Sequence, residues 1–393
     1  MAEGATTGQR LLKRAAVLAM AILASACSTV VPRTAPPVYQ PVNEAPRPYE
    51  PVITPGLPTD NEHHMVALLV PLTGTNGAVG RSIANATQLA LLDTDNAELR
   101  VTSYDTATGP AAAAQKAIDD GARLILGPLL ADDVRAVLPV AKRAGVPVIG
   151  FSNDTSLAGS GAYLMGYSPA QSIERVVDYA RGQGVTTYGA LVANGVYGQR
   201  ASTAFLRAVE GAKGQVVSLQ NYDRTAASIA GAAARLGRAG SVGAVLIVDD
   251  GAAAAGVVTL MRKGEPGARV LGTERWNNEA SVLTKPSLNG AWFASVPDNL
   301  YRQYATKYRT RFGAAPYRLS SMGYDAVLLT IRIARDWPIG RPFPEDRLRD
   351  KGGFAGIDGA FRFGRDGFAE RALEVQEVRG GTTVTVSPAP TGF

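Results

Sequence analysis

Few residues of this chain have the chemistry of a catalytic nucleophile or a metal ligand. The 393 residues include one cysteine, Cys27, and two adjacent histidines, His63 and His64. We expect both histidines to precede the first folded segment, so the core would lack the imidazole that Ser-His-Asp sites, Cys-His sites and many metal centres need. A single cysteine also excludes a disulfide framework and a cysteine-based zinc site. The sequence therefore predicts no catalytic residue, no metal site and no cofactor.

Polar residues that could bind a ligand follow predicted strands. Ser152, Asn153 and Thr155 come after a buried run and could offer hydroxyl, amide and backbone N–H groups. Thr73 follows an earlier run in the same way. The same residue types also serve in turns and helix caps that need no ligand, and both interpretations stay open.

Two further candidates lie later in the chain. Tyr197 stands at the predicted start of a helix, where its ring could cover a ligand or pack against its own part of the fold. Glu274 follows a strand, where it could face a cleft, or it could lie in a solvated loop and pair with Arg275. The pair Asp249 and Asp250 also ends a strand, and we interpret it as a solvated turn.

The elements that position these residues alternate between strand and helix from Met65 onward. Apolar residues make up 46% of the chain and charged residues 19%, which excludes wholesale disorder. Short buried runs alternate with alanine-rich helical stretches, a pattern typical of parallel sheets covered by helices on both faces. Because there are too many units for one sheet, we predict an α/β fold with two doubly wound parallel-sheet lobes and a cleft between them.

The lobes are predicted to be discontinuous in sequence. Lobe 1 would comprise about 62–166 and 290–337, and lobe 2 about 167–289 and 338–393. The chain would cross between them near 163–169, and the last strands would be antiparallel. Ligands of such sheets bind where the carboxyl ends of the strands meet, so we expect a site in the cleft.

The N-terminal segment has the pattern of an export signal. Residues 1–26 contain basic residues, a short apolar run and small residues, and the run is too short to span a bilayer. Cys27 follows directly and resembles the cysteine of a bacterial lipobox, with Ala24 where leucine is usual. The resemblance implies a lipid on Cys27, and Ser28 implies outer-membrane sorting. The alternative is an ordinary cleaved signal with a chance cysteine.

Residues 27–61 are predicted to be a lipid-bearing, proline-rich stalk. Nine prolines fall within 28–61, and such a segment would reach on the order of 100 Å if fully extended. It would hold the folded region, 62–393, away from the membrane, or it would serve only as disordered padding.

The formal charge of +6 comes from basic residues that are scattered singly. A mildly basic surface could meet anionic lipid or glycan, but without clustered basic residues we predict no nucleic-acid partner.

Several segments together resemble the type I periplasmic binding proteins of the branched-chain amino-acid receptor kind. The matching segments are 66–74, 79–80, 104–105, 117–128, 144–149, 197–198 and 272–274. The resemblance covers about 65–390 and implies a bilobal binding-protein fold. It also places Glu274 where these receptors bind the ligand ammonium group.

Within that superfamily, three segments look most like the penicillin-binding protein activators, outer-membrane lipoproteins that stimulate peptidoglycan synthases. They are 71–74, 126–129 and 151–154. The best-known activators carry a helical-repeat domain before this one, whereas this chain has only the proline-rich stalk there.

The chain departs from the receptors after the strand at 123–126. Receptors place small hydroxyl residues there to bind the ligand carboxylate, whereas this chain has Leu129, Leu130, Ala131, Asp132 and Asp133. The two carboxylates would repel a ligand carboxylate, or they would cap the following helix.

Two functions follow from these expectations. The first is a non-enzymatic lipoprotein, anchored on the periplasmic face of the outer membrane, that activates a class A penicillin-binding protein. The alternative is a solute receptor for amino acids or similar small ligands that feeds an ABC transporter. Its ligand would contact Thr73, Ser152, Asn153, Thr155, Tyr197 and Glu274.

Overall fold

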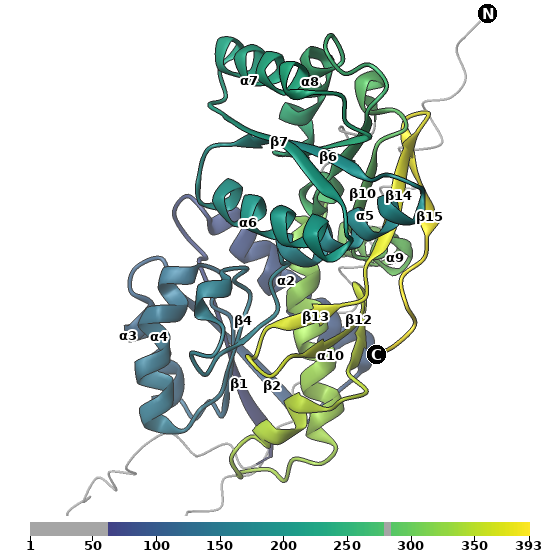
Figure 1. The fold of residues 1–393 in the computed structure, drawn as a ribbon. Helices are drawn as coiled ribbons and strands as arrows, with labels where there is room; N and C mark the ends of the chain where they lie inside the picture. Colours follow the sequence, from purple (N-terminus) through teal and green to yellow (C-terminus); the bar gives the residue numbers. More distant parts are fainter. Residues whose placement is uncertain (1–61, 279–283) are drawn as a thin grey trace, which may run out of the picture. The chain divides into compact units, whose positions relative to one another are not determined.

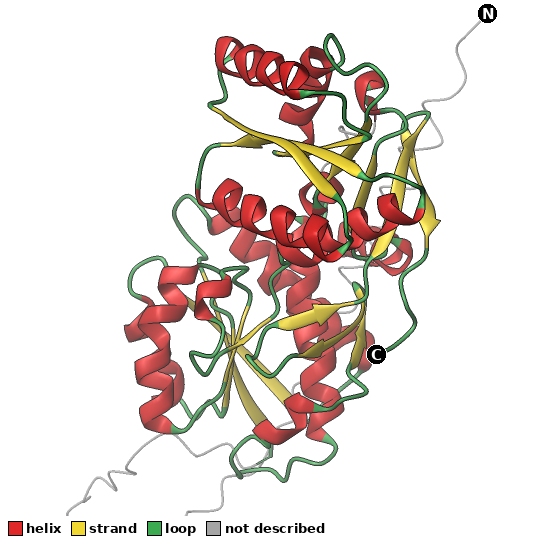
Figure 2. Cartoon of the chain, in the orientation of Figure 1, coloured by secondary structure: helices red, strands yellow, loops and turns green. Residues whose placement is uncertain are grey.

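The computed structural model describes residues 62–278 and 284–393 (Figure 1). These residues form two lobes, each with a largely parallel sheet between layers of helices (Figure 2). The predicted α/β fold class is confirmed. The signal segment, Cys27 and the stalk lie outside the described residues. Within 62–278 and 284–393, no helix is long and apolar enough to cross a membrane.

Lobe 1 contains a five-stranded parallel sheet in the order β2-β1-β3-β4-β5. Its strands are β1 (His64–Val70), β2 (Leu99–Asp105), β3 (Leu124–Leu126), β4 (Val148–Gly150) and β5 (Tyr163–Leu164). Its helices are α2 (Gly77–Thr94), α3 (Pro110–Asp119), α4 (Ala131–Ala144), α9 (Asn299–Phe312) and α10 (Ser321–Ala334). Except in the edge strand β2, the strands are almost continuously apolar because both faces of the sheet are covered.

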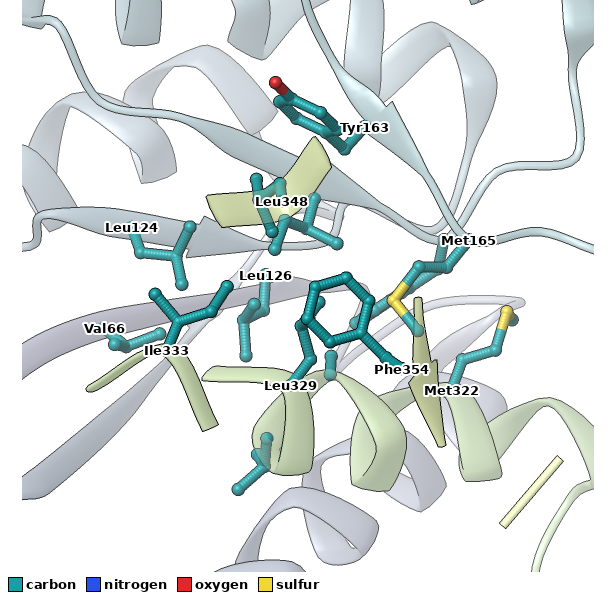
Figure 3. Close-up of a cluster of buried hydrophobic side chains, with 14 of the residues drawn as sticks. Val66, Leu124, Leu126, Tyr163, Met165, Met322, Leu329, Ile333, Leu348 and Phe354 are labelled. Carbon is teal, nitrogen blue, oxygen red and sulfur yellow. The ribbon is translucent and has the colours of Figure 1, made fainter. Parts of the chain in front are cut away.

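Alternate residues of β1 show how the two faces are filled. Val66 and Leu68 pack into a core that includes Met322, Leu329 and other residues of α10 (Figure 3). The intervening residues of β1 pack instead against α3 and α4. Because side chains alternate along a strand, one short run serves both cores.

Lobe 2 contains a seven-stranded sheet in the order β15-β14-β10-β9-β8-β6-β7. Its strands are β6 (Thr187–Ala193), β7 (Gln215–Tyr222), β8 (Ala244–Val248), β9 (Arg269–Gly272), β10 (Trp292–Ser295), β14 (Glu374–Arg379) and β15 (Thr382–Ser387). Its helices are α5 (Pro169–Gly182), α6 (Val196–Gly211), α7 (Ala226–Ala239) and α8 (Gly251–Met261). The five parallel strands repeat the connection order of lobe 1, and β14 and β15 add an antiparallel edge beside β10.

The predicted lobe boundaries in the last third of the chain need correction. The segment 290–337 was predicted to lie in lobe 1, but its strand β10 completes the parallel sheet of lobe 2. The segment 338–393 was predicted to lie in lobe 2, but its first part forms a small sheet whose aromatic side chains pack into the lobe 1 core. That sheet comprises β11 (Phe354–Gly356), β12 (Gly359–Phe363) and β13 (Ala369–Arg371). Short antiparallel strands have similar patterns in either lobe, so the sequence does not distinguish them.

His64 lies within the fold rather than before it, contrary to the prediction. It begins β1, is 2% exposed, and stacks on Trp337 with ring centroids 4.2 Å apart. Burial lowers the pKa of His64, and the charge of Glu98 offsets part of that effect. The stack makes His64 a packing residue of lobe 1.

The chain passes between the lobes three times. The first crossing lies between β5 and α5, the second between β10 and α9, and the third between β13 and β14. The first agrees with the crossing predicted near 163–169. Residues beside these crossings therefore lie where the lobes join.

Candidate functional site

In lobe 1, the predicted ligand residues make local structural bonds. The Thr73 hydroxyl donates to Asp105 Oδ2 at 2.6 Å and so joins the loop after β1 to the end of β2. The Ser152 hydroxyl oxygen accepts the backbone N–H of Asp154 at 3.1 Å. Asn153 is exposed and Thr155 begins a short 3₁₀ turn. These contacts agree with the turn and capping interpretation of this loop.

In lobe 2, the structure brings Tyr197 and Glu274 together. Tyr197 lies in the first turn of α6, Glu274 comes shortly after β9, and the Tyr197 hydroxyl donates to Glu274 Oε1 at 2.8 Å. Glu274 Oε2 is buried and has no hydrogen-bond partner among the described residues. Burial raises the pKa of Glu274 to about 7, although the hydrogen bond from Tyr197 partly opposes this shift.

Arg275 does not pair with Glu274, so the solvated-loop interpretation of Glu274 is wrong. The guanidinium of Arg275 lies 4.8 Å from the centre of the Tyr197 ring, where a cation–π contact holds the ring in place. Tyr197 is thus fixed by Arg275 on its face and by Glu274 at its hydroxyl.

Glu274 lines a small cavity beside the three crossings, which we call the crossover cavity. Its volume is about 10 Å³, room for about one water molecule. Its walls come from both lobes and from the crossings, and its polar residues include Tyr167, Ser168, Gln171, Ser172, Glu274, Asn277, Ser295, Arg318 and Arg371. Of the predicted site residues, only Glu274 lines it.

No sequence pattern indicated Arg318 or Arg371, although both are buried in this wall. Arg318 Nη1 donates to Asp358 Oδ1 at 2.6 Å, and the Tyr167 hydroxyl donates to the other oxygen of that carboxylate at 2.5 Å. Burial raises the pKa of Asp358, but the nearby arginines outweigh this effect and hold it below its usual value. Arginine is usually exposed, so no periodic pattern could have identified these two residues.

A second feature joins the lobes through Asp154. This side chain follows β4 of lobe 1, and its carboxylate contacts Arg200 of α6 in lobe 2 at 2.6 Å and Arg135 of α4 at 2.9 Å. Burial alone would raise the pKa of Asp154, but hydrogen bonds from Ser156 and both arginines lower it to about 2. Asp154 therefore stays ionised at any ordinary pH.

A groove of about 610 Å³ lies along α5 and α6 beside this ion pair. Thr155 of lobe 1 lines it, together with charged residues of α5 and α6 that include Glu174, Asp178, Arg200 and Arg207. The loop after β4 thus contributes to the groove rather than to the crossover cavity.

The acidic residues after β3 do not cap a helix, contrary to one prediction. The N-cap of α4 is Leu130, and Asp132 and Asp133 lie in its first turn. Carboxylates there are favoured by the helix dipole. Asp132 also pairs with Arg135 at 2.7 Å.

The interpretation of Asp249 as part of a solvated turn is also wrong. Asp249 is buried and pairs with Arg224 at 2.6 Å, and it accepts the Tyr222 hydroxyl at 3.0 Å. Asp250 caps α8 by accepting the backbone N–H of Ala253. Both are structural contacts of lobe 2.

Comparisons with known proteins show which family profile, which relative and which solved structures this chain resembles. The profile of the periplasmic binding protein family matches residues 65–382. An uncharacterised protein of Rickettsia prowazekii, RP748, is 28% identical over 139 residues. That match spans 35% of this chain and 37% of the relative.

Two solved structures illustrate the similarity in fold. One, from Rhodospirillum rubrum, is provisionally described as a branched-chain amino acid ABC transporter; it has a TM-score of 0.73 at 20% identity, covering 82% of this chain and 100% of that chain. The other is LpoA from Haemophilus influenzae, with a TM-score of 0.65 at 20% identity over 83% of this chain and 59% of that chain. Proteins of both descriptions share the bilobal fold.

Proposed function

The chain belongs to the periplasmic binding protein family, and from this premise we propose that its folded region binds a small polar solute between the lobes. The observation that carries the proposal is the unpaired Oε2 of Glu274 in the wall of the crossover cavity. A buried acceptor without a partner costs about 1–3 kcal/mol. A ligand ammonium group would supply the missing donor, so an amino acid or a similar solute suits this position.

The N-terminal pattern supports a role in the cell envelope. We propose that Cys27 anchors the protein to the periplasmic face of the outer membrane, and that the bound solute is passed to an ABC transporter. The sequence of the stalk is compatible with this arrangement because it separates the folded region from the anchor.

Activation of a class A penicillin-binding protein is the second candidate. Two observations favour it: the crossover cavity admits about one water molecule, and Leu129 and Leu130 replace the hydroxyl residues of the receptors. In that case a surface of one lobe would contact the synthase, and no solute would be needed.

A solute screen tests the first proposal. We expect at least one of the twenty α-amino acids to raise the Tm of the purified chain, and Glu274→Gln to weaken its binding at least 10-fold in calorimetry. Glu210→Gln is the control, because Glu210 is exposed near the end of α6. If no amino acid binds and the chain instead accelerates glycan polymerisation by a class A synthase, the second candidate replaces the first.

A further inference from the structure

Arg371 is a buried cation whose hydrogen-bonding capacity is only partly used. It is 7% exposed, and its Nη2 donates to the backbone carbonyl of Met165 at 2.6 Å. Its Nε and Nη1 have no hydrogen-bond partner among the described residues. The charge of Arg371 acts on the buried carboxylates of Asp358 and Asp325, but neither of these two nitrogens forms a hydrogen bond with them. Leaving buried donors unbonded is costly unless an acceptor approaches them.

Arg318 has the same incomplete set of partners on the same wall. It is 6% exposed, and although Nη1 bonds to Asp358, its Nε and Nη2 make no hydrogen bond within the described residues. Its Nη2 lies 3.7 Å from an oxygen of Asp298, beyond hydrogen-bond distance. The two arginines therefore leave four buried nitrogens unbonded beside one cavity.

One water molecule cannot accept hydrogen bonds from all four of these nitrogens. A water accepts about two hydrogen bonds, whereas a carboxylate accepts about four through its two oxygens. Both guanidinium groups are also held in place: Arg318 lies 3.9 Å from the centre of the Tyr301 ring, and Arg371 lies 5.0 Å from that of Tyr167. Donors fixed in this way lose little conformational entropy when they bind an anion.

We propose that Arg318 and Arg371 form a carboxylate subsite of the cleft. The proposal rests on the proposed solute-binding function and names the ligand class, a small carboxylate. Because the cavity of about 10 Å³ is smaller than a carboxylate group, the lobes must move apart for the ligand to enter.

Acetate is a probe that tests the subsite without knowledge of the full ligand. We expect 100 mM sodium acetate to raise the Tm of the full chain relative to sodium chloride at equal ionic strength. In Arg371→Gln and Arg371→Lys, the acetate concentration needed for half of that shift should rise at least 10-fold. Arg332→Gln is the matched control, because Arg332 is an exposed arginine paired with Asp350 on the surface of α10. The lysine variant preserves the positive charge should the glutamine variant fail to fold.

The outcomes separate this subsite from the proposed function. If acetate has no effect while an amino acid binds, the subsite is wrong and solute binding stands. If acetate raises the Tm of Arg371→Lys at the same concentrations as in the wild type, acetate binds elsewhere, and the proposed subsite is wrong. If neither acetate nor any solute binds, both proposals fail.

Discussion

At the scale of the residue, this molecule keeps several charges away from water at the ends of its strands. Asp249 is neutralised by Arg224, and Asp154 by two arginines, so their burial is compensated. Glu274 accepts the Tyr197 hydroxyl at Oε1 and is affected by the charge of Arg275, but its second oxygen has no hydrogen-bond partner among the described residues. An incompletely compensated group of this kind is characteristic of a binding site, whereas the compensated groups serve the fold.

The raised pKa of Glu274 predicts a stability that depends on pH. The folded-state pKa of about 7 exceeds the ordinary value of 4.5, so the folded state binds this proton more tightly than the unfolded state. The resulting stability is complete below pH 4.5 and is lost as pH rises through about 7. Because Glu274→Gln cannot ionise, we expect the wild-type free energy of unfolding to fall relative to the variant by at most about 3 kcal/mol between pH 4.5 and 8.

Urea unfolding at a series of pH values measures this difference. Glu210→Gln is again the control, and its curve should run parallel to that of the wild type. If the free energy of unfolding of Glu274→Gln varies with pH in parallel with that of the wild type, the pKa of Glu274 is not raised in the folded state.

At the scale of the element, each lobe has a glycine in the first helical turn after its first strand, and this glycine lets the helix pack closely against the strand end. Gly80 in α2 and Gly198 in α6 have no room for a side chain: a Cβ would lie 1.8 Å from the Pro71 carbonyl oxygen in one case and 2.0 Å from that of Ala193 in the other. Each helix thus approaches the end of the preceding strand closely. In lobe 2 this approach places Tyr197 beside Glu274.

Replacing Gly198 by alanine should therefore destabilise the protein. The new Cβ would force the start of α6 away from β6, and we expect a loss of about 1–3 kcal/mol or more in the free energy of unfolding. Gly256→Ala in α8 is the control, because nothing lies within 4 Å of its added Cβ. We expect the control to be stabilised by about 0.5–1 kcal/mol, measured by chemical unfolding. Equal stabilities of the two variants would contradict the close approach.

At the scale of the whole folded region, an ion pair between Asp154 of lobe 1 and Arg200 of lobe 2 connects the two lobes. The ion pair is partly buried, and Asp154 remains charged over the physiological range, so the contact persists across ordinary pH. The three crossings allow the lobes to pivot, and this pair opposes the opening movement.

Removing Arg200 should shift the molecule toward an open form. We expect Arg200→Ala to increase the radius of gyration measured by X-ray scattering and to leave the secondary structure unchanged. Arg207→Ala is the control, because Arg207 is exposed on the same helix and forms no ion pair within the described part of the chain. An unchanged radius in Arg200→Ala, with the solute still bound normally, would show that the pair does not hold the lobes.

Sequence patterns were informative where a local rule applies and failed where the partners are distant. The buried runs of β1 and β8 predict strands because both faces of each sheet are covered, and the restarted pattern predicts the second lobe. By contrast, β10 and β12 have similar short patterns, and only packing decides that they lie in different lobes. Glu274 could be found because it follows a strand, but Arg371 could not, because its burial depends on residues from other segments.

Because the chain crosses back to lobe 1 after β10, the two lobes cannot finish folding in the order in which they begin in the sequence. The five parallel strands of lobe 2 and the helices α5 to α8 come from one continuous stretch, 169–295, whereas lobe 1 needs α10 to cover one face of a sheet whose strands end at 164. Because α2 covers only part of that face, a nascent or newly exported chain leaves the rest of it exposed until residues beyond 320 arrive. During that interval the exposed part of the face favours aggregation, because transiently exposed apolar surface is prone to associate.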